Sequence, residues 1–277
     1  RETPLEMSTT DKQILQTKEL DYRVLNLSTS TFNENETSYF HKSIGGYHPA
    51  KLRRYQDMID TYIAPEMSKL MTAVVKAQGD MTKLNGDSIC PILNMLNTKF
   101  FIMPLQGGQT VPLKNPYAFG NAWFVDKLTY VDNANEEIAQ VGKLKLRDEA
   151  VADKKFLKQL GQAVVQDNTS LVTLKTYQPN QLTYEVESNK GGVVVFSEVY
   201  YPGWTAKVDG QSVEVGRVNY ILRAINVKPG KHEVVLSFFP KSVDITESIA
   251  YAAFALLVVL ILLVAFIEFK KQKSSRQ

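Results

Sequence analysis

Cysteine is nearly absent from this chain of 277 residues: Cys90 is the only one, so no disulfide can form within it. Small extracellular domains often depend on such cross-links, but a chain of this length can bury enough apolar surface to fold without them. Histidine is also scarce, and His41 and His48 are separated by a Gly-Gly break with no carboxylate at a recognisable ligand spacing. We therefore predict no metal site.

The short motifs of several enzyme classes are missing as well. The chain has no GxSxG nucleophile elbow and no Walker A or GxGxxG phosphate loop. Cys90 lies in the apolar context SICPIL, which is typical of a core thiol rather than a nucleophile. We assign no catalytic residue and predict that this chain binds no cofactor by itself.

An excess of one charge is not found either, once the C-terminal tail is set aside. The whole chain has 32 Lys+Arg and 29 Asp+Glu, and removing the four basic residues and one acid that follow residue 267 leaves 28 of each. A neutral surface lacks the basic excess that nucleic-acid binding needs. We predict that nucleic acid is not a partner.

One long apolar run stands out against this ordinary composition. From Ile249 to Ile267 the chain has no charge, proline or glycine. At about 1.5 Å per residue this run spans the hydrocarbon core of a bilayer, which favours a transmembrane helix at 245–267 over a buried core helix. The lipid bilayer is therefore an expected partner.

The charges beside this run predict its orientation. The tail 268–277 is basic, and the positive-inside rule then places the C-terminus in the cytosol; its basic residues are Lys270, Lys271, Lys273 and Arg276. The rest of the chain would lie outside the cytoplasmic membrane, in the periplasm of a Gram-negative cell. Residues 1–30 hold no hydrophobic export signal and no initiator Met. We expect a fragment or processed chain whose missing part carries a signal peptide or further membrane helices.

The extracytoplasmic part divides by pattern into two predicted domains. Strand-like and helix-like segments alternate over residues 1–165, which is typical of an α/β domain. Short alternating runs then fill 168–241, and Asp209-Gly210 is a strong hairpin signal among them. Seven short strands predict a β-sandwich; they are 171–176, 181–188, 192–200, 204–208, 212–215, 219–226 and 231–239.

The richest polar segment, HKSIGGYHPAKLRRY, lies at 41–55. Basic side chains pair with phosphate, and glycine lets a ligand approach the backbone, so the segment is a candidate anion or sugar-phosphate site. The alternative is a solvated helix face with a flexible entry loop. The candidate glycan- or phosphate-binding residues here are His41, Lys42, Tyr47, His48, Lys51, Arg53 and Arg54.

An aromatic corner between two sandwich strands gives a second candidate. Its residues Tyr200, Tyr201 and Trp204 surround Pro202-Gly203. Exposed rings can stack on sugars, as in carbohydrate-binding sandwiches. The alternative, which we favour, is a corner that plugs the core or rests on lipid headgroups, where Trp and Tyr concentrate.

Several long segments, in order along the chain, resemble one known family. They are SYFHKSIGGYHPAKLRRYQDMID, LNMLNTKFFI, NPYAFGNAWFV, VYYPGWTAKVDGQSVEV, NYILRA and PGKHEV. Together they resemble the C-terminal region of YfhO-family bacterial membrane proteins, in the version found in Bacteroidetes. The resemblance runs from about Asp21 to the last helix.

The resemblance implies a function that the residues alone do not. Members of that family are multi-pass proteins similar to GT-C glycosyltransferases, which take a sugar from a polyprenyl-phosphate carrier on the outer side of the membrane. The GT-C catalytic acid lies in an early loop between N-terminal membrane helices, a region that this chain lacks. The implied cofactor of the full-length protein is a polyprenyl-phosphate-linked sugar, and the implied partners are the missing helices and a glycan.

Two hypotheses follow for this chain. The first is an accessory module of the transferase that binds or orients an acceptor glycan, and it predicts a concave surface with exposed aromatic and basic residues. The second is a non-catalytic structural or assembly module, and it predicts that the same residues are buried or packed between domains.

Overall fold

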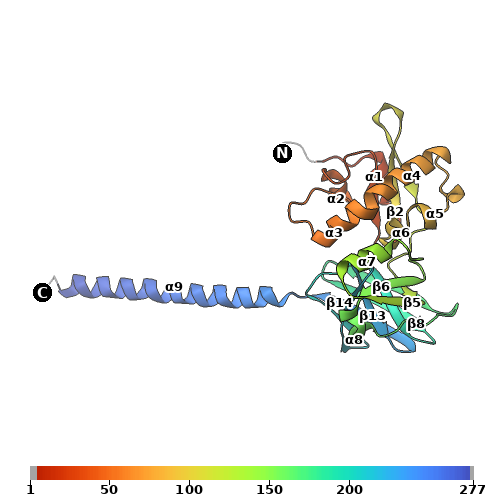
Figure 1. The fold of residues 1–277 in the computed structure, drawn as a ribbon. Helices are drawn as coiled ribbons and strands as arrows, with labels where there is room; N and C mark the ends of the chain where they lie inside the picture. The colour runs from red at the N-terminus through yellow and green to blue at the C-terminus, as the bar shows by residue number, and fades with distance from the viewer. Residues whose placement is uncertain (1–4, 275–277) are drawn as a thin grey trace. The chain divides into compact units, whose positions relative to one another are not determined.

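The computed structural model of the chain describes the backbone of residues 5–274 and the side chains of residues 5–240 and 245–267. Its contacts define two compact units (Figure 1). The globular unit comprises the chain up to Tyr200 together with Thr205–Ser237, and the C-terminal unit comprises Tyr201–Trp204 together with the chain from Phe238. Part of the predicted basic tail, residues 275–277, lies outside the described residues, and so do the side chains of 268–274.

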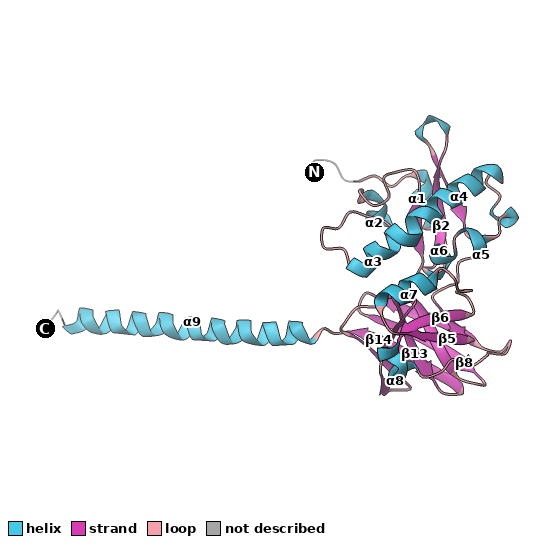
Figure 2. Ribbon diagram, in the orientation of Figure 1, coloured by secondary structure: helices cyan, strands magenta, loops and turns pink. Residues whose placement is uncertain are grey.

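The first half of the globular unit is a small α/β layer in which helices surround a three-stranded sheet (Figure 2). The strand order is β1-β2-β3, with β1 parallel and β3 antiparallel to β2. The strands are β1 (Arg23–Asn26), β2 (Thr98–Pro104) and β3 (Thr110–Lys114). The helices are α1 (Thr9–Ile14), α2 (Glu36–Phe40), α3 (Arg53–Met58), α4 (Ala64–Lys76), α5 (Gly86–Ile89) and α6 (Pro91–Met95), with 3₁₀ turns at Met81–Lys83 and Gln106–Gly108.

Proline explains an irregularity between α3 and α4. Pro65 has no N–H to donate, and its ring collides with the carbonyl group four residues earlier in a regular helix. A π-helical turn at Ile59–Ile63 precedes Pro65 and joins α3 to α4 without a break. The helical segments on either side of the π-helical turn therefore form one continuous rod.

The second half of the globular unit is a β-sandwich. One sheet has the order β11-β10-β14-β8-β7 and the other β12-β13-β9-β4. Tyr184 and Phe196, one ring from each sheet, meet with centroids 4.9 Å apart in the buried layer between them. The strands are β4 (Ala122–Val125), β7 (Leu171–Gln178), β8 (Gln181–Ser188), β9 (Gly192–Val199), β10 (Trp204–Val208), β11 (Gln211–Val213), β12 (Gly216–Val218), β13 (Leu222–Val227) and β14 (Gly230–Phe238).

The predicted fold class is confirmed: an α/β part is followed by an all-β sandwich and one C-terminal apolar helix. The hairpin predicted at Asp209-Gly210 is present, with φ of 50° and 80° and Val208 opposite Gln211. Eight strands lie between residues 171 and 238 rather than seven, because Asn219 and Tyr220 adopt positive φ and turn the chain between β12 and β13. The segment 219–226 is thus a turn followed by a strand.

Another difference links the two halves. Residues 122–131 form two strands rather than one, because β4 and β5 (Lys127–Val131) separate at Asp126 and join different sheets. β4 pairs with β9 in the sandwich, whereas β5 pairs in parallel with β6 (Glu149–Asp153) beside α7 (Ala134–Val141). A 3₁₀ turn at Lys154–Phe156 and α8 (Leu157–Leu160) complete this region. The domain boundaries near 165 and 168 stay predictions.

The C-terminal unit ends in the long helix α9 (Lys241–Ser274). Its stretch Ile245–Ile267 has a mean hydropathy of 3.0, and none of it is buried against the protein. An apolar helix of this length with no protein cover has the length and composition that cross a membrane. The interval matches the segment expected from the sequence.

A buried carboxylate connects two helices of the α/β half. Glu66 on α4 accepts hydrogen bonds from the backbone N–H groups of Ile92 (2.9 Å) and Leu93 (3.0 Å), at the start of α6. Burial raises the pKa of Glu66 to about 7, although both N–H groups act to lower it. In the unfolded chain the same group ionises near its ordinary pKa of 4.5.

This shift predicts a pH dependence of stability. Between about pH 4.5 and 7 the folded chain keeps a proton that the unfolded chain has lost, so raising the pH favours unfolding. We expect the free energy of unfolding to fall across this window by on the order of 3 kcal/mol more in the wild type than in Glu66→Gln. Urea unfolding of both proteins at a series of pH values measures the difference; parallel curves would contradict it.

Candidate functional site

A cleft of about 690 Å³ opens in the globular unit beside the segment singled out in the sequence. Its wall is mostly apolar, and small-molecule sites of roughly 300–1,000 Å³ have this character. Tyr39 is 67% exposed and Tyr47 is 59% exposed, so both rings remain available at the cleft. The lining consists of Asn35, Ser38, Tyr39, Gly45, Gly46, Tyr47, His48, Ala50, Lys51, Leu52, Tyr55 and Val199.

Two glycines let the chain form this wall. A Cβ atom on Gly45 would lie 2.0 Å from the backbone oxygen of Thr31, and one on Gly46 would lie 2.8 Å from Oγ of Ser38. Gly46 also has a φ of 105°, a conformation that other residues rarely adopt. The Gly-Gly pair therefore permits close backbone packing, which brings Tyr47 to the rim of the cleft.

Hydrogen-bonding groups are few and well defined along the wall. Nδ1 of His48 accepts from the backbone N–H of Ala50 at 3.1 Å, so the ring hydrogen is carried by Nε2. Among the described residues Nε2 of His48 has no hydrogen-bond partner. The ammonium group of Lys51 lies 5.3 Å from the centre of the Phe32 ring. The cleft thus combines aromatic faces with an N–H donor and a cation.

The other candidates from the same segment have intramolecular partners. His41 is buried, and its Nε2 is 2.8 Å from Oδ1 of Asp11. Arg53 is exposed and pairs with Asp57 along α3 at 2.9 Å. Of the seven candidates in this segment, Tyr47, His48 and Lys51 line the cleft, while His41, Lys42, Arg53 and Arg54 do not.

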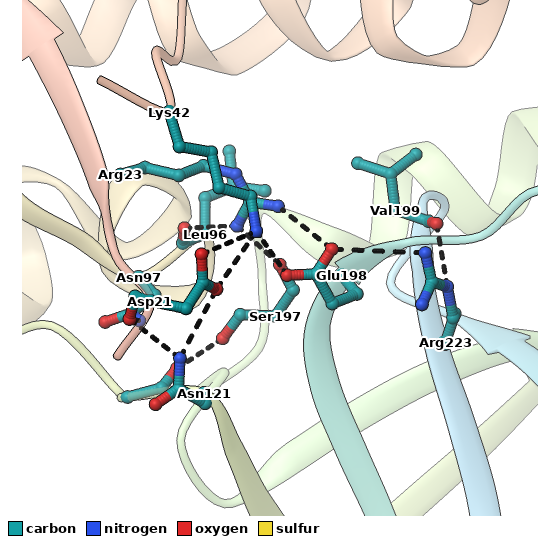
Figure 3. Close-up of polar contacts among 11 residues, drawn as sticks. Asp21, Arg23, Lys42, Leu96, Asn97, Asn121, Ser197, Glu198, Val199 and Arg223 are labelled. Atoms are coloured by element: carbon teal, nitrogen blue, oxygen red, sulfur yellow. Dashed lines mark hydrogen bonds and ion pairs between the residues drawn. The ribbon is translucent and has the colours of Figure 1, made fainter. Parts of the chain in front are cut away.

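Lys42 belongs to a largely buried charged cluster whose member Glu198 precedes the cleft residue Val199 in sequence (Figure 3). Its Nζ lies 3.0 Å from both carboxylate oxygens of Asp21 and 2.5 Å from Oε1 of Glu198. Arg23 and Arg223 approach the other oxygen of Glu198 at 3.7 and 3.9 Å. Three cations and two carboxylates therefore meet where β1, the loop after α2 and strands β9 and β13 come together.

The pKa values of the two carboxylates in this cluster are shifted in opposite directions. Burial acts to raise the pKa of Glu198, but the attraction of Arg23 and Lys42 outweighs it and holds that pKa well below its ordinary value. Burial, with repulsion from Glu198, raises the pKa of Asp21 despite the opposing attraction of Lys42. Glu198 is therefore the carboxylate that the surrounding cations stabilise most strongly in its charged form.

The cluster is connected to two parts of the cleft wall. Glu198 immediately precedes Val199 on β9, and Nε of Arg223 donates to the Val199 carbonyl at 3.0 Å. Lys42 begins the stretch that continues through Gly45 and Gly46 into the wall. The contact between Lys42 and Glu198 thus joins two segments that are 156 residues apart in sequence and that both continue into the cleft wall.

A second buried ion cluster holds α3 in place. Glu137 on α7 is 0% exposed, and its Oε2 accepts from Arg217 at 2.9 Å and from Arg54 at 3.2 Å. The guanidinium group of Arg54 also lies 4.2 Å from the centre of the Tyr220 ring. Arg54, a candidate ligand contact in the sequence, is therefore engaged with its own protein here.

The aromatic corner is divided between the two units. The Tyr200 ring packs against Phe156 at 5.8 Å within the globular unit. Tyr201 and Trp204 belong to the C-terminal unit, where their rings lie 6.1 and 5.3 Å from that of Phe238. Each part of the corner therefore packs its rings within its own unit.

Among the side chains that the structure describes, no group of three His, Cys, Asp or Glu residues is placed to hold an ion. Cys90 is buried, and burial, with the nearby carboxylates Glu66 and Asp87, raises its pKa to about 12. Such a thiol stays protonated and unreactive at neutral pH.

A folded unit joined to an exposed apolar helix long enough to span a bilayer defines this chain as a membrane protein. Residues 137–250 match the family described as "Bacterial membrane protein YfhO". The resemblance to this family that the sequence predicted is confirmed over these residues. The matched residues run from α7 through the sandwich into α9, and the cleft residues 35–55 precede them.

A curated relative supports the same family. The "Uncharacterized protein YfhO" of Bacillus subtilis (strain 168) is 25% identical over 117 residues, which cover 42% of this chain. The match spans only 14% of that protein's length. No solved structure matches the chain.

Proposed function

We propose that the globular unit is an accessory module of a glycosyltransferase-like YfhO protein, and that its cleft binds an acceptor glycan. The observation that carries this proposal is the convergence of Tyr39, Tyr47, His48 and Lys51 on one concave, mostly apolar surface. Sugar rings present apolar C–H faces, which suit aromatic side chains, and hydroxyl groups, which need hydrogen-bond partners. A cation at the wall favours glycans that carry an acidic or phosphate group.

We place this module outside the bacterial cytoplasmic membrane, in the periplasm of a Gram-negative cell, with the C-terminus in the cytosol. The excess of Lys and Arg after residue 267 supports this orientation through the positive-inside rule. A polyprenyl-phosphate-linked sugar would then be the donor used by the full-length protein, on the same side as the cleft. We assign catalysis to the remaining membrane helices of that protein and a positioning role to this chain.

A second candidate function is a structural module that assembles a membrane complex. It is favoured by the intramolecular partners of His41, Lys42 and Arg54, since these side chains support the fold rather than face a ligand. The two functions differ in whether they need exposed aromatic rings, and mutagenesis can test this difference. A binding module needs the exposed rings of Tyr39 and Tyr47 for affinity, and a structural module does not.

We expect Tyr47→Ala to weaken glycan binding about tenfold or more, because a ring that anchors a ligand contributes at least about 1.4–2 kcal/mol. The full 277-residue chain in lipid nanodiscs would be screened on an array of bacterial cell-envelope oligosaccharides and against polyprenyl-phosphate sugars. Tyr47→Phe should retain most of the affinity, because it keeps the aromatic face.

Leu105→Ala is the control, since it removes another exposed apolar side chain of the globular unit from outside the cleft. Equal losses in Tyr47→Ala and Leu105→Ala would contradict binding in the cleft. Absence of binding to every probe by a folded wild-type chain would favour the structural module.

A further inference from the structure

The C-terminal unit contains an aromatic cluster that packs immediately before the membrane helix. Tyr201 lies in the turn after β9 and Trp204 begins β10, whereas Phe238 ends β14 and Phe239 follows it. The Phe238 ring contacts those of Trp204 and Tyr201, at centroid distances of 5.3 and 6.1 Å. Two segments more than 30 residues apart thus form one aromatic surface.

The backbone fastens this cluster to the chain that enters α9. The N–H group of Phe239 donates to the Gly203 carbonyl at 3.0 Å. Gly203 has a φ of 105°, and a Cβ atom there would lie 3.1 Å from the Phe238 ring and 3.2 Å from Pro240. The turn therefore packs closely on the residues before the helix, and it groups with that helix rather than with the sandwich.

The surface remains apolar and open to its surroundings. Tyr201 is 47% exposed and Phe239 is 59% exposed. The segments 200–206 and 238–240, which form the cluster and its edges, contain no charged residue. An exposed patch of this kind needs a partner that tolerates apolar rings beside polar hydroxyl and indole N–H groups.

The distance to the membrane span indicates which partner that is. α9 begins at Lys241, and at a helical rise of about 1.5 Å per residue Ile245 follows about 6 Å further along. The headgroup layer on each side of a bilayer is between about 5 and 8 Å thick, from the difference between total and hydrocarbon thickness. A cluster fixed at the start of α9 therefore falls within that layer.

We propose that Tyr201, Trp204, Phe238 and Phe239 form an interfacial anchor that inserts into the phospholipid headgroup layer. The amphipathic rings of Trp and Tyr partition to this layer, and Phe238 and Phe239 add apolar area beside the acyl chains. The anchor fixes the depth of α9 at its first turn. It also makes the turn after β9 part of the membrane attachment, although β9 itself belongs to the sandwich.

Tryptophan fluorescence tests this anchor, since Trp123 and Trp204 are the only two tryptophans and Trp123 is buried in the globular unit. The full chain would be reconstituted in phosphatidylethanolamine–phosphatidylglycerol vesicles with a spin label on the headgroup, high on the acyl chain or at mid-chain. We expect the headgroup and high acyl labels to quench strongly and the mid-chain label weakly. Trp204→Phe should abolish that quenching.

The variant Trp123→Phe leaves Trp204 as the sole tryptophan and should keep the same depth profile. Because it retains the anchor, it reports the depth of Trp204 even if Trp204→Phe does not fold. Quenching that is unchanged by Trp204→Phe, or absent with every label, would overturn the proposal and point to a protein cover for the cluster. Strongest quenching at mid-chain would overturn it as well. The test involves no glycan, so it stands or fails separately from the function proposed for the cleft.

Discussion

Glu198→Gln should lower the free energy of unfolding by about 3–5 kcal/mol, the usual effect of removing one partner from a buried ion cluster. The substitution keeps the shape of the side chain and removes its charge. Lys42, Arg23 and Arg223 would then face a single carboxylate, Asp21, in a region with little access to water. The midpoint of thermal unfolding should fall by on the order of 10 °C for a unit of this size.

Urea and thermal unfolding of the full chain measure this loss. Glu187→Gln is the matched control, because it makes the same change at an exposed position on β8, the preceding strand, which lies in the other sheet; we expect a change within about 0.5 kcal/mol. Similar effects of the two substitutions would contradict the role given to the cluster.

A double-mutant cycle tests the pairing itself. Adding Lys42→Met to Glu198→Gln should restore part of the lost stability, because the second change removes a cation that the first left uncompensated. We expect the two substitutions to couple by about 1 kcal/mol or more. Additive effects would mean that Lys42 and Glu198 stabilise the fold independently of each other.

The sequence predicts the parts of this fold that depend on neighbouring residues. The apolar run at 245–267 needs only its own composition to indicate a membrane helix, and α9 contains it. Asp209-Gly210 indicates a hairpin because both positions must adopt positive φ, and both do. The strands from 171 to 238 alternate or run apolar over short lengths, which is again a local signal.

Features that depend on distant partners could not be predicted in the same way. β4 reads as the start of one strand with β5, yet it pairs with β9, about 70 residues further along. Asp126 marks the break: its Oδ1 accepts from the backbone N–H of Gln166 at 2.7 Å, a contact that no local pattern reveals. The α/β topology was accordingly less predictable than the sandwich.

The candidate site also depends on contacts between distant residues, which the sequence pattern did not reveal. Composition singled out the segment 41–55, and Tyr47, His48 and Lys51 do line a cleft. Its exposed partner Tyr39 was missed, because it lies before the basic run. Lys42 and Arg54 looked like ligands for an anion, but the anions they meet are Glu198 and Glu137 of the same chain. Basic residues near an aromatic and glycine-rich segment therefore do not reveal which of them have internal partners.

Glu137→Gln should give the second large loss of stability. Its effect reports on the ion cluster that joins α3 to α7, which is distinct from the cluster around Glu198. Glu137 is completely buried and accepts from Arg217, Arg54 and the backbone N–H of Tyr220. Neutralising it leaves two guanidinium groups without their shared anion, which should reduce the free energy of unfolding by about 3–5 kcal/mol. Chemical unfolding of the full chain measures this loss.

Glu136→Gln, one residue earlier on α7, is the matched control. The Glu136 carboxylate is exposed and only caps the start of the helix, accepting from Asp132 and Asn133. A change there should lower stability by about 1 kcal/mol or less. Hydrogen exchange then locates the difference: Glu137→Gln should speed exchange in α3, which Arg54 joins to α7, whereas Glu136→Gln should leave α3 protected. Unchanged protection of α3 in Glu137→Gln would mean that apolar packing of Met58 and its neighbours holds that helix without the ion cluster.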